Sequence, residues 1–155
     1  MLVERSAALI RASREEVRMS TSSLGSAAGV DPSMIEAFEA GTEQPSEAVL
    51  TRILRAARLR PSIPVALFAD EIVTVAGHFR LRNVRVFGST VRGHDAQASD
   101  VDLLVSTTPA TSLFDLGGFA RAVESMIGFP VDVFTAPAIP RFATDRLFTT
   151  CLVRA

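Results

Sequence analysis

A proline-rich break divides the chain into two parts with different sequence patterns. Pro61 and Pro64 stand three residues apart, and two prolines at this spacing end a helix and suit a short, stiff linker. Before the break, apolar residues recur at helical spacing, whereas strand-like and helical runs alternate after it. A chain of 155 residues is long enough for two small domains. We therefore expect an α+β protein with an all-α domain at residues 1–62 and an α/β domain at residues 63–155.

The composition excludes several classes of protein. A hydrophobic content of 48% with 21% charged residues is typical of a globular chain rather than a disordered one. The net charge of −1 argues against coating nucleic acid by bulk charge, although a local basic patch remains open. One cysteine and two histidines offer neither an intramolecular disulfide nor a zinc cluster. No apolar run approaches the roughly 18 residues of a membrane span, and no signal-type segment is present, so we expect a cytoplasmic protein without membrane contact.

The first part carries the start and stop signals of short helices. Asp31 and Pro32 form a strong helix start, because the aspartate accepts from free N–H groups and the proline occupies the first helical position. This helix is expected to end at Gly41. The short helix before it ends near Gly29, and a pair of helices separated by residues 29–31 has the spacing of a helix-turn-helix.

The fuller pattern, over residues of about 4 to 60, resembles the XRE-type (phage-repressor-like) helix-turn-helix family. The residues that carry it are Ile10, Arg11, Arg14, Leu24, Ala28, Gly29, Val30, Ile35, Phe38–Gly41, Gln44–Ser46, Leu50, Ile53 and Leu54. The resemblance implies a five-helix domain that binds operator DNA, usually as a dimer, with residues 32–40 as the helix in the major groove.

The predicted recognition helix departs from that family in its charge. Residues 31–40 include three acids and no arginine, and acids repel phosphates. The candidate base contacts are Ser33, Met34 and Glu36, and the candidate phosphate contacts are Arg14, Arg18 and the helix start at Ser22 and Ser23. The alternative is a helical bundle used for dimerisation or for docking a partner.

The second part alternates strands and helices. The expected elements are a helix at 65–79, strands at 83–87, 101–105 and 131–134, a short helix at 90–93, a helix at 113–127 and a terminal helix from about residue 140. Asp100 and Asp102 would share one face of the second strand, roughly 6–7 Å apart. Mg²⁺ takes oxygen ligands, including one or two carboxylates and substrate phosphates. An Asp-x-Asp pair alone also fits a turn cap beside an exposed acid.

The residues before this pair favour the chemical interpretation. Gly88 and Ser89 directly follow the first strand. A glycine there lets the main chain approach a phosphate, and the serine hydroxyl and the following N–H groups bind phosphate oxygens. Arg92, one turn later, adds a charge-assisted hydrogen bond. If the third strand pairs beside the second, Asp132 joins the other acids as a general base or a further metal ligand.

The motif Gly88-Ser89-x-x-Arg92-Gly93 … Ser99-Asp100-x-Asp102, with Asp132 later, closely resembles the minimal nucleotidyltransferase (MNT) family of the DNA polymerase beta-like superfamily. The resemblance covers about residues 66 to 155 and includes Ser112–Leu116 and Gly128–Asp132. It implies a small domain with a mixed sheet and the following roles. Asp100, Asp102 and Asp132 would be the catalytic Mg²⁺ ligands, and Gly88, Ser89 and Arg92 would hold the triphosphate of ATP.

MNT-family proteins are often antitoxins that neutralise a HEPN-type toxin by transferring AMP to one of its tyrosine hydroxyls. The resemblance therefore implies an antitoxin with nucleotidyltransferase activity that also represses its own operon, as a homodimer or a hetero-oligomer with the toxin. Three alternatives remain: an antitoxin that masks the toxin without catalysis, a transcription regulator that senses nucleotide, and an antibiotic nucleotidyltransferase. The short C-terminal portion disfavours the last, because little chain remains for an acceptor pocket.

Overall fold

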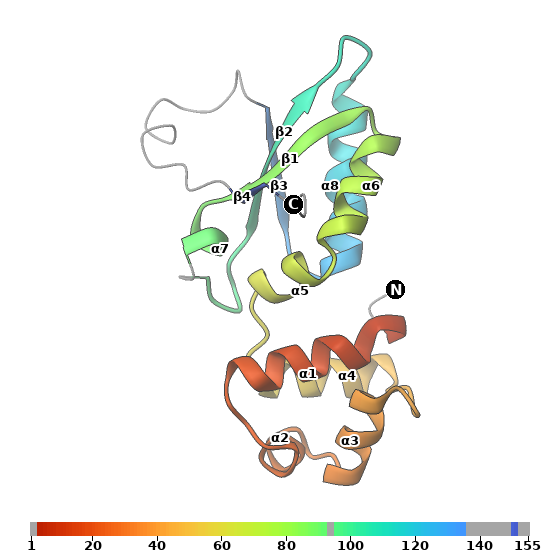
Figure 1. The fold of residues 1–155 in the computed structure, drawn as a ribbon, viewed down its shortest axis with the longest axis vertical. Helices are drawn as coiled ribbons and strands as arrows, with labels where there is room; N and C mark the ends of the chain where they lie inside the picture. The colour runs from red at the N-terminus through yellow and green to blue at the C-terminus, as the bar shows by residue number, and fades with distance from the viewer. Residues whose placement is uncertain (1–2, 93–94, 136–149, 152–155) are drawn as a thin grey trace.

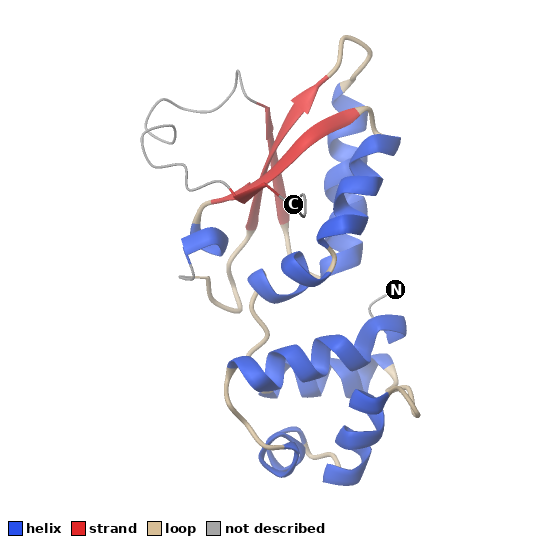
Figure 2. Cartoon of the chain, in the orientation of Figure 1, coloured by secondary structure: helices blue, strands red, loops and turns tan. Residues whose placement is uncertain are grey.

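The computed structural model describes residues 3–92, 95–135 and 150–151. A helical part is followed by a part in which helices and strands alternate (Figures 1 and 2), so the predicted α+β class is confirmed. Within these described ranges, no helix combines the length and the apolar character that crossing a lipid bilayer requires.

The first part is a helical bundle. Its elements are a 3-10 turn at Val3–Arg5 and the helices α1 (Ser6–Glu16), α2 (Thr21–Ala28), α3 (Pro32–Ala40) and α4 (Glu47–Ala56). Asp31 accepts from the backbone N–H of Ser33 at the start of α3, and Gly41 ends the helix with φ +73°. Both predicted ends of α3 are therefore confirmed.

Close packing at the predicted turn holds α2 against α3. Gly29 turns the chain after α2 with φ +64°, a conformation that favours glycine. A Cβ on Gly25 would collide with the carbonyl oxygen of Val30, so glycine allows α2 to approach the turn this closely. Leu24 and Ile35, one from each helix, are fully buried in the bundle core. The helix-turn-helix therefore depends both on the turn at Gly29 and on the close packing of α2 against α3.

The two prolines of the break lie at the start of a helix, so the prediction of a stiff linker is wrong. Pro61 directly precedes α5 (Ser62–Leu67), and Pro64 stands in its first turn. A proline is tolerated there because the N–H groups of the first turn have no partner within the helix. Phe68, whose ring is buried, separates α5 from α6 (Ala69–His78). The single helix expected at 65–79 is therefore two helices.

A mixed four-stranded sheet forms the centre of the second part, in the order β3-β2-β1-β4. Its strands are β1 (Leu81–Phe87), β2 (Val101–Thr107), β3 (Val131–Thr135) and β4 (Thr150–Cys151). Strand β2 pairs antiparallel with β1 and parallel with β3, which confirms the expected neighbours.

The expected terminal helix is wrong at residues 150–151, because these pair with β1 as the antiparallel strand β4. Pairing there supplies partners to the backbone groups along the outer edge of β1. The rest of that expected helix lies outside the described residues.

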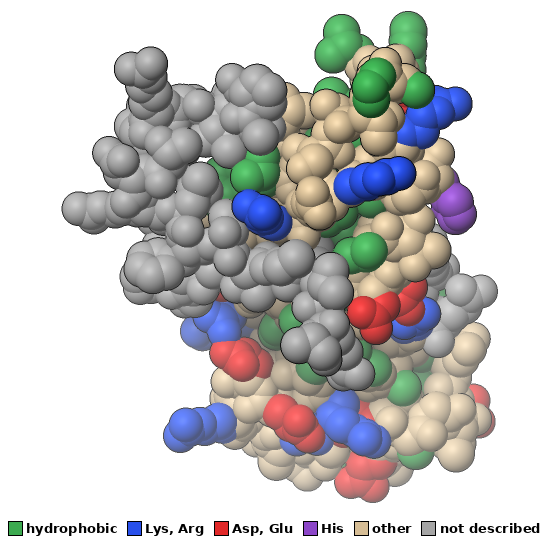
Figure 3. All heavy atoms as spheres, turned by 45° about the horizontal axis from the view of Figure 1, so that its top comes forward, with side chains coloured by type: hydrophobic (Ala, Val, Ile, Leu, Met, Phe, Trp, Pro, Cys, Tyr) green, Lys and Arg blue, Asp and Glu red, His purple; other side chains and the backbone are tan. Residues whose placement is uncertain are grey.

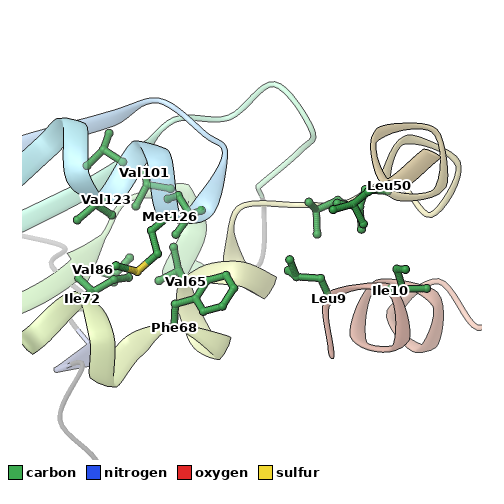
Figure 4. Close-up of a cluster of buried hydrophobic side chains, with 14 of the residues drawn as sticks. Leu9, Ile10, Leu50, Val65, Phe68, Ile72, Val86, Val101, Val123 and Met126 are labelled. Carbon is green, nitrogen blue, oxygen red and sulfur yellow. The ribbon is translucent and has the colours of Figure 1, made fainter. Parts of the chain in front are cut away.

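Helices α6 and α8 (Leu113–Ile127) cover one face of the sheet (Figure 1). Val101, Leu103 and Val105 of β2 are at most 1% exposed, as expected for the strand side that faces the helices. Figure 4 shows buried side chains of both parts. In the second part, Val86, Val101, Val123 and Met126 gather beside α5. In the first part, Leu9, Ile10 and Leu50 lie between α1 and α4. The opposite face of the sheet is therefore where polar residues of the strands can lie.

Hydrogen bonds and ion pairs join the two parts near α5. Asp95, whose side chain is buried, accepts from the backbone N–H of Ser62 at 2.8 Å. Gln97 donates to the carbonyl oxygen of Arg55 at the end of α4. Arg60, between α4 and α5, pairs with Glu16 of α1 and lies 3.9 Å from the Asp95 carboxylate. The segment after α7 (Ser89–Arg92) is thus tied to the junction between α4 and α5.

Candidate active site

The turn between β1 and α7 places the main chain against a carboxylate. Gly88 follows β1 with φ +78°, in the left-handed region that favours glycine. A Cβ on Gly88 would overlap with the Oδ2 atom of Asp102. The predicted glycine-serine turn and the predicted acidic strand are therefore in direct contact.

Strand register brings a second carboxylate beside the first. Asp102 on β2 is the partner of Asp132 on β3 and of Phe87 on β1. Neighbouring strands lie about 4.8 Å apart, and register partners project from the same face. Asp102 is half-buried and Asp132 is exposed. Two of the three predicted acids thus share the sheet face away from α6 and α8.

Asp100 lies just ahead of this pair and not within the strand. Strand β2 begins at Val101, whose N–H donates to the carbonyl oxygen of Pro130 at 2.9 Å. Asp100 itself is exposed. Because it precedes the strand, the alternation of side chains along β2 does not determine which way its carboxylate points. Among the residues that the structure describes, no three Asp, Glu, His or Cys side chains are grouped to hold one metal ion.

Helix α7 presents the other predicted nucleotide-binding residues. Ser89 is its first residue and Arg92 its last; the side chain of Arg92 lies outside the described part. Thr90 is buried, and its hydroxyl has no hydrogen-bond partner among the described atoms. Sequence reasoning missed this buried hydroxyl, because a threonine in a short helix after a turn is more often exposed.

Arg18, between α1 and α2, is exposed, and so are the five candidate DNA contacts on the two helices of the helix-turn-helix. These are Ser22 and Ser23 in the first turn of α2, and Ser33, Met34 and Glu36 on α3. Thr21 donates to Glu36 at 3.1 Å, so the two helices meet at this surface. Ser20, not the Ser22-Ser23 pair, caps α2 by accepting from the N–H of Ser23. On the face seen in Figure 3, acidic and basic side chains are mixed over the bundle.

Arg14, one of the candidate phosphate contacts, has a side chain that is bound within the bundle. Its Nε and Nη2 atoms donate to the two carboxylate oxygens of Glu39 at 2.7 and 2.8 Å, and Nη1 donates to the carbonyl oxygen of Met19. The bond to Glu39 raises the pKa of Arg14. Glu39 on α3 is only 9% exposed, and a buried carboxylate requires such a partner. One of the acids of the recognition helix is therefore neutralised inside the fold.

Comparison with known proteins identifies both parts. Residues 74–150 match the nucleotidyltransferase domain, and residues 7–62 match a helix-turn-helix domain. A Methanocaldococcus jannaschii protein named "Putative protein adenylyltransferase" is 30% identical over 77 residues, which are 50% of this chain and 83% of that protein. The chain belongs to the nucleotidyltransferase domain family.

Two solved structures are similar to this nucleotidyltransferase. One, described as a "putative minimal nucleotidyltransferase", has 25% sequence identity and a TM-score of 0.49 over 54% of this chain and 85% of the other. The second is a toxin-antitoxin crystal structure with AMP-PNP, with 16% identity and a TM-score of 0.47 over 56% of this chain and 73% of the other.

The matched ranges agree with the positions of the structural elements. The nucleotidyltransferase match begins within α6 and ends at β4. It therefore includes the whole of strands β1, β2 and β3, the Gly88-Ser89 turn and all three predicted catalytic acids. The helix-turn-helix match includes most of α1 and all of α2, α3 and α4, and ends at the first residue of α5.

Proposed function

We propose that this nucleotidyltransferase transfers AMP from ATP to a hydroxyl group of a partner protein. The observation that carries the proposal is the contact between the Gly88 main chain and the Asp102 carboxylate, with Asp132 in register beside it. A phosphate-binding turn next to paired carboxylates is the arrangement that nucleotidyl transfer needs. The similarity to a protein named as a protein adenylyltransferase supports a protein acceptor.

The residues present fit magnesium. Carboxylates are the protein ligands that Mg²⁺ prefers, and it commonly takes only one or two of them together with phosphate oxygens. Asp102 and Asp132 share one face, and these two would hold the ion with the nucleotide; Asp100, exposed just before the strand, would add a third carboxylate if its side chain turned towards the pair. Bound Mg²⁺ would stabilise charge on the attacking and leaving oxygens.

In the proposed reaction, the acceptor hydroxyl oxygen forms a bond to the α-phosphorus of ATP. The bond from that phosphorus to the oxygen bridging the α- and β-phosphates breaks, and pyrophosphate leaves. The hydroxyl proton passes to a carboxylate, for which exposed Asp132 is the candidate. Ser89 and the N–H groups at the start of α7, with Arg92 at its end, would orient the triphosphate.

Labelled ATP tests this enzymatic proposal. The full chain is incubated with Mg²⁺, ATP labelled at the α-phosphate, and the protein encoded by the neighbouring gene. We expect label on the partner, and a loss of about a thousandfold in rate for the Asp102→Asn and Asp132→Asn variants. Asp70→Asn, which removes an exposed acid on α6, is the control and should retain full activity. Equal labelling by wild type and both site variants would refute the proposal.

The finer part of the proposal concerns the partner. By the family resemblance, the acceptor is a tyrosine hydroxyl of a HEPN-type toxin, and the modification neutralises it. Mass spectrometry of the labelled partner identifies the modified residue. Suppression of toxicity by Asp102→Asn in cells would instead favour masking of the toxin by simple binding.

The helix-turn-helix is proposed to bind the operator of the same operon. Its support is the exposed set on α2 and α3, where Met34 is 37% exposed. Fluorescence anisotropy with DNA from upstream of the gene is the test, at two salt concentrations because phosphate contacts are salt-dependent. Met34→Glu should weaken binding about tenfold or more by adding charge next to phosphates, whereas Ala48→Glu, at an exposed position of α4, should not. Equal binding by both variants would place the DNA contact elsewhere.

A further inference from the structure

Two phenylalanines form an aromatic pair outside the main hydrophobic core. The rings of Phe87 on β1 and Phe134 on β3 have centroids 5.4 Å apart and planes at 70°. Strand β2 lies between these two strands, so the rings meet across it. Both side chains are half-buried, and neither belongs to the core cluster or to the residues packed against it.

The pair lies on the same sheet face as the carboxylates. Phe87 is the register partner of Asp102, and Phe134 stands two residues after Asp132. Because side chains alternate along a strand, all four side chains project from the same face of the sheet. Leu104, the register partner of Phe134, is 6% exposed and also stands outside the core cluster. The acidic end of this face therefore continues into a small apolar patch.

We propose that Phe87 and Phe134 bind the purine base of the nucleotide by stacking, an inference that rests on the function proposed above. Phe87 is bonded directly to Gly88, so an aromatic ring stands next to the proposed phosphate-binding turn along the chain. An edge-to-face pair leaves ring faces unused by the pair itself, and bases stack on such faces. The position beside the phosphate turn favours the nucleotide base over the aromatic ring of an acceptor tyrosine.

Fluorescence of 2-aminopurine riboside triphosphate tests the proposal directly, because stacking quenches this base. The chain contains neither Trp nor Tyr, so the protein adds little background emission. With the full chain and Mg²⁺, we expect quenching on binding and displacement by ATP. Phe134→Leu and Phe87→Leu keep apolar volume but lose the flat ring; each should weaken nucleotide binding about tenfold and reduce the quenching. Phe134→Trp should restore both.

Matched controls separate stacking from folding and from the proposed function. Phe114→Leu removes a ring that is 91% exposed at the start of α8 and should change nothing. Inorganic tripolyphosphate lacks the base, so its affinity should be equal in wild type and in the leucine variants, which also shows that they are folded. Unchanged ATP affinity in the leucine variants would overturn the stacking proposal and leave the enzymatic one intact. The same conclusion would follow if the leucine variants raised only the KM for the acceptor protein. A wild-type chain that binds neither ATP nor tripolyphosphate would overturn both.

Discussion

The two domains use acidic residues in opposite ways. In the helix-turn-helix, Glu39 is buried and held by two hydrogen bonds from Arg14, so its charge fastens α3 to α1. In the nucleotidyltransferase domain, Asp132 is exposed and Asp102 half-buried on the sheet face away from α6 and α8. An acid therefore indicates chemistry only where the fold leaves it accessible. Substitutions in both domains can test this contrast, and the largest effect is expected at this sheet face.

Among changes that leave the carboxylates in place, Gly88→Ala should have the largest effect, on activity. The new Cβ would push the Asp102 carboxylate aside, and misplacement of about 1 Å at a reacting centre can lower a rate about a hundredfold. Gly41→Ala is the matched control, because it has a similar φ of +73° with nothing near the added atom. Adenylyl-transfer assays should show the loss for Gly88→Ala alone. If Gly41→Ala loses as much, backbone strain rather than contact with Asp102 is responsible.

Arg14→Ala should be the most destabilising change. It leaves the buried Glu39 carboxylate with the more distant Arg11, 3.9 Å away, in place of its two hydrogen bonds from Arg14, which costs about 3 kcal/mol. Arg80→Ala breaks an ion pair in which the arginine side chain is 58% exposed, and it should cost less than about 1 kcal/mol. Urea unfolding followed by circular dichroism measures both. Similar losses for the two variants would show that burial of Glu39 has little energetic importance.

Loss of helix caps should have a smaller effect in each domain. Ser112→Ala removes a reciprocal capping box with Asp115 on α8, whereas Ser46→Ala removes a single cap of α4 with a longer bond of 3.4 Å. Each change should cost about 1 kcal/mol, with Ser112→Ala the larger. Thermal unfolding gives the order, and a larger loss for Ser46→Ala would contradict it.

Acid should weaken the Asp115 cap over a narrow range of pH. Hydrogen bonds from the Ser112 backbone and hydroxyl, together with Arg80, lower the pKa of Asp115. Because the folded pKa is the lower one, the stabilisation is full above the unfolded value of about 3.9 and is lost as pH falls through the folded pKa. Asp115→Asn should therefore differ in stability from wild type at pH 6, and the difference should shrink as the pH falls below the unfolded pKa of about 3.9. A constant difference across this range would contradict the assignment.

Local signals predicted elements well where caps are strong. Helix α3 begins and ends at the residues predicted from Asp31-Pro32 and Gly41, and α8 has the predicted bounds 113–127. Asp-x-Asp spacing and the glycine-serine turn also identified the strands that meet at the candidate site. Local signals were insufficient where the outcome depends on distant partners: Arg14 looked like a surface cation, and residues 150–151 looked helical.

The sequence by itself determined the two-part organisation, the helix-turn-helix and the order of the candidate site residues, because caps, turns and hydrophobic spacing act between near neighbours in the chain. Only the tertiary structure decided that β2 and β3 align Asp102 with Asp132, that Gly88 lies against Asp102, and that Phe87 meets Phe134 across β2. These relations depend on strand register, in which a slip of one residue would turn every side chain to the other face.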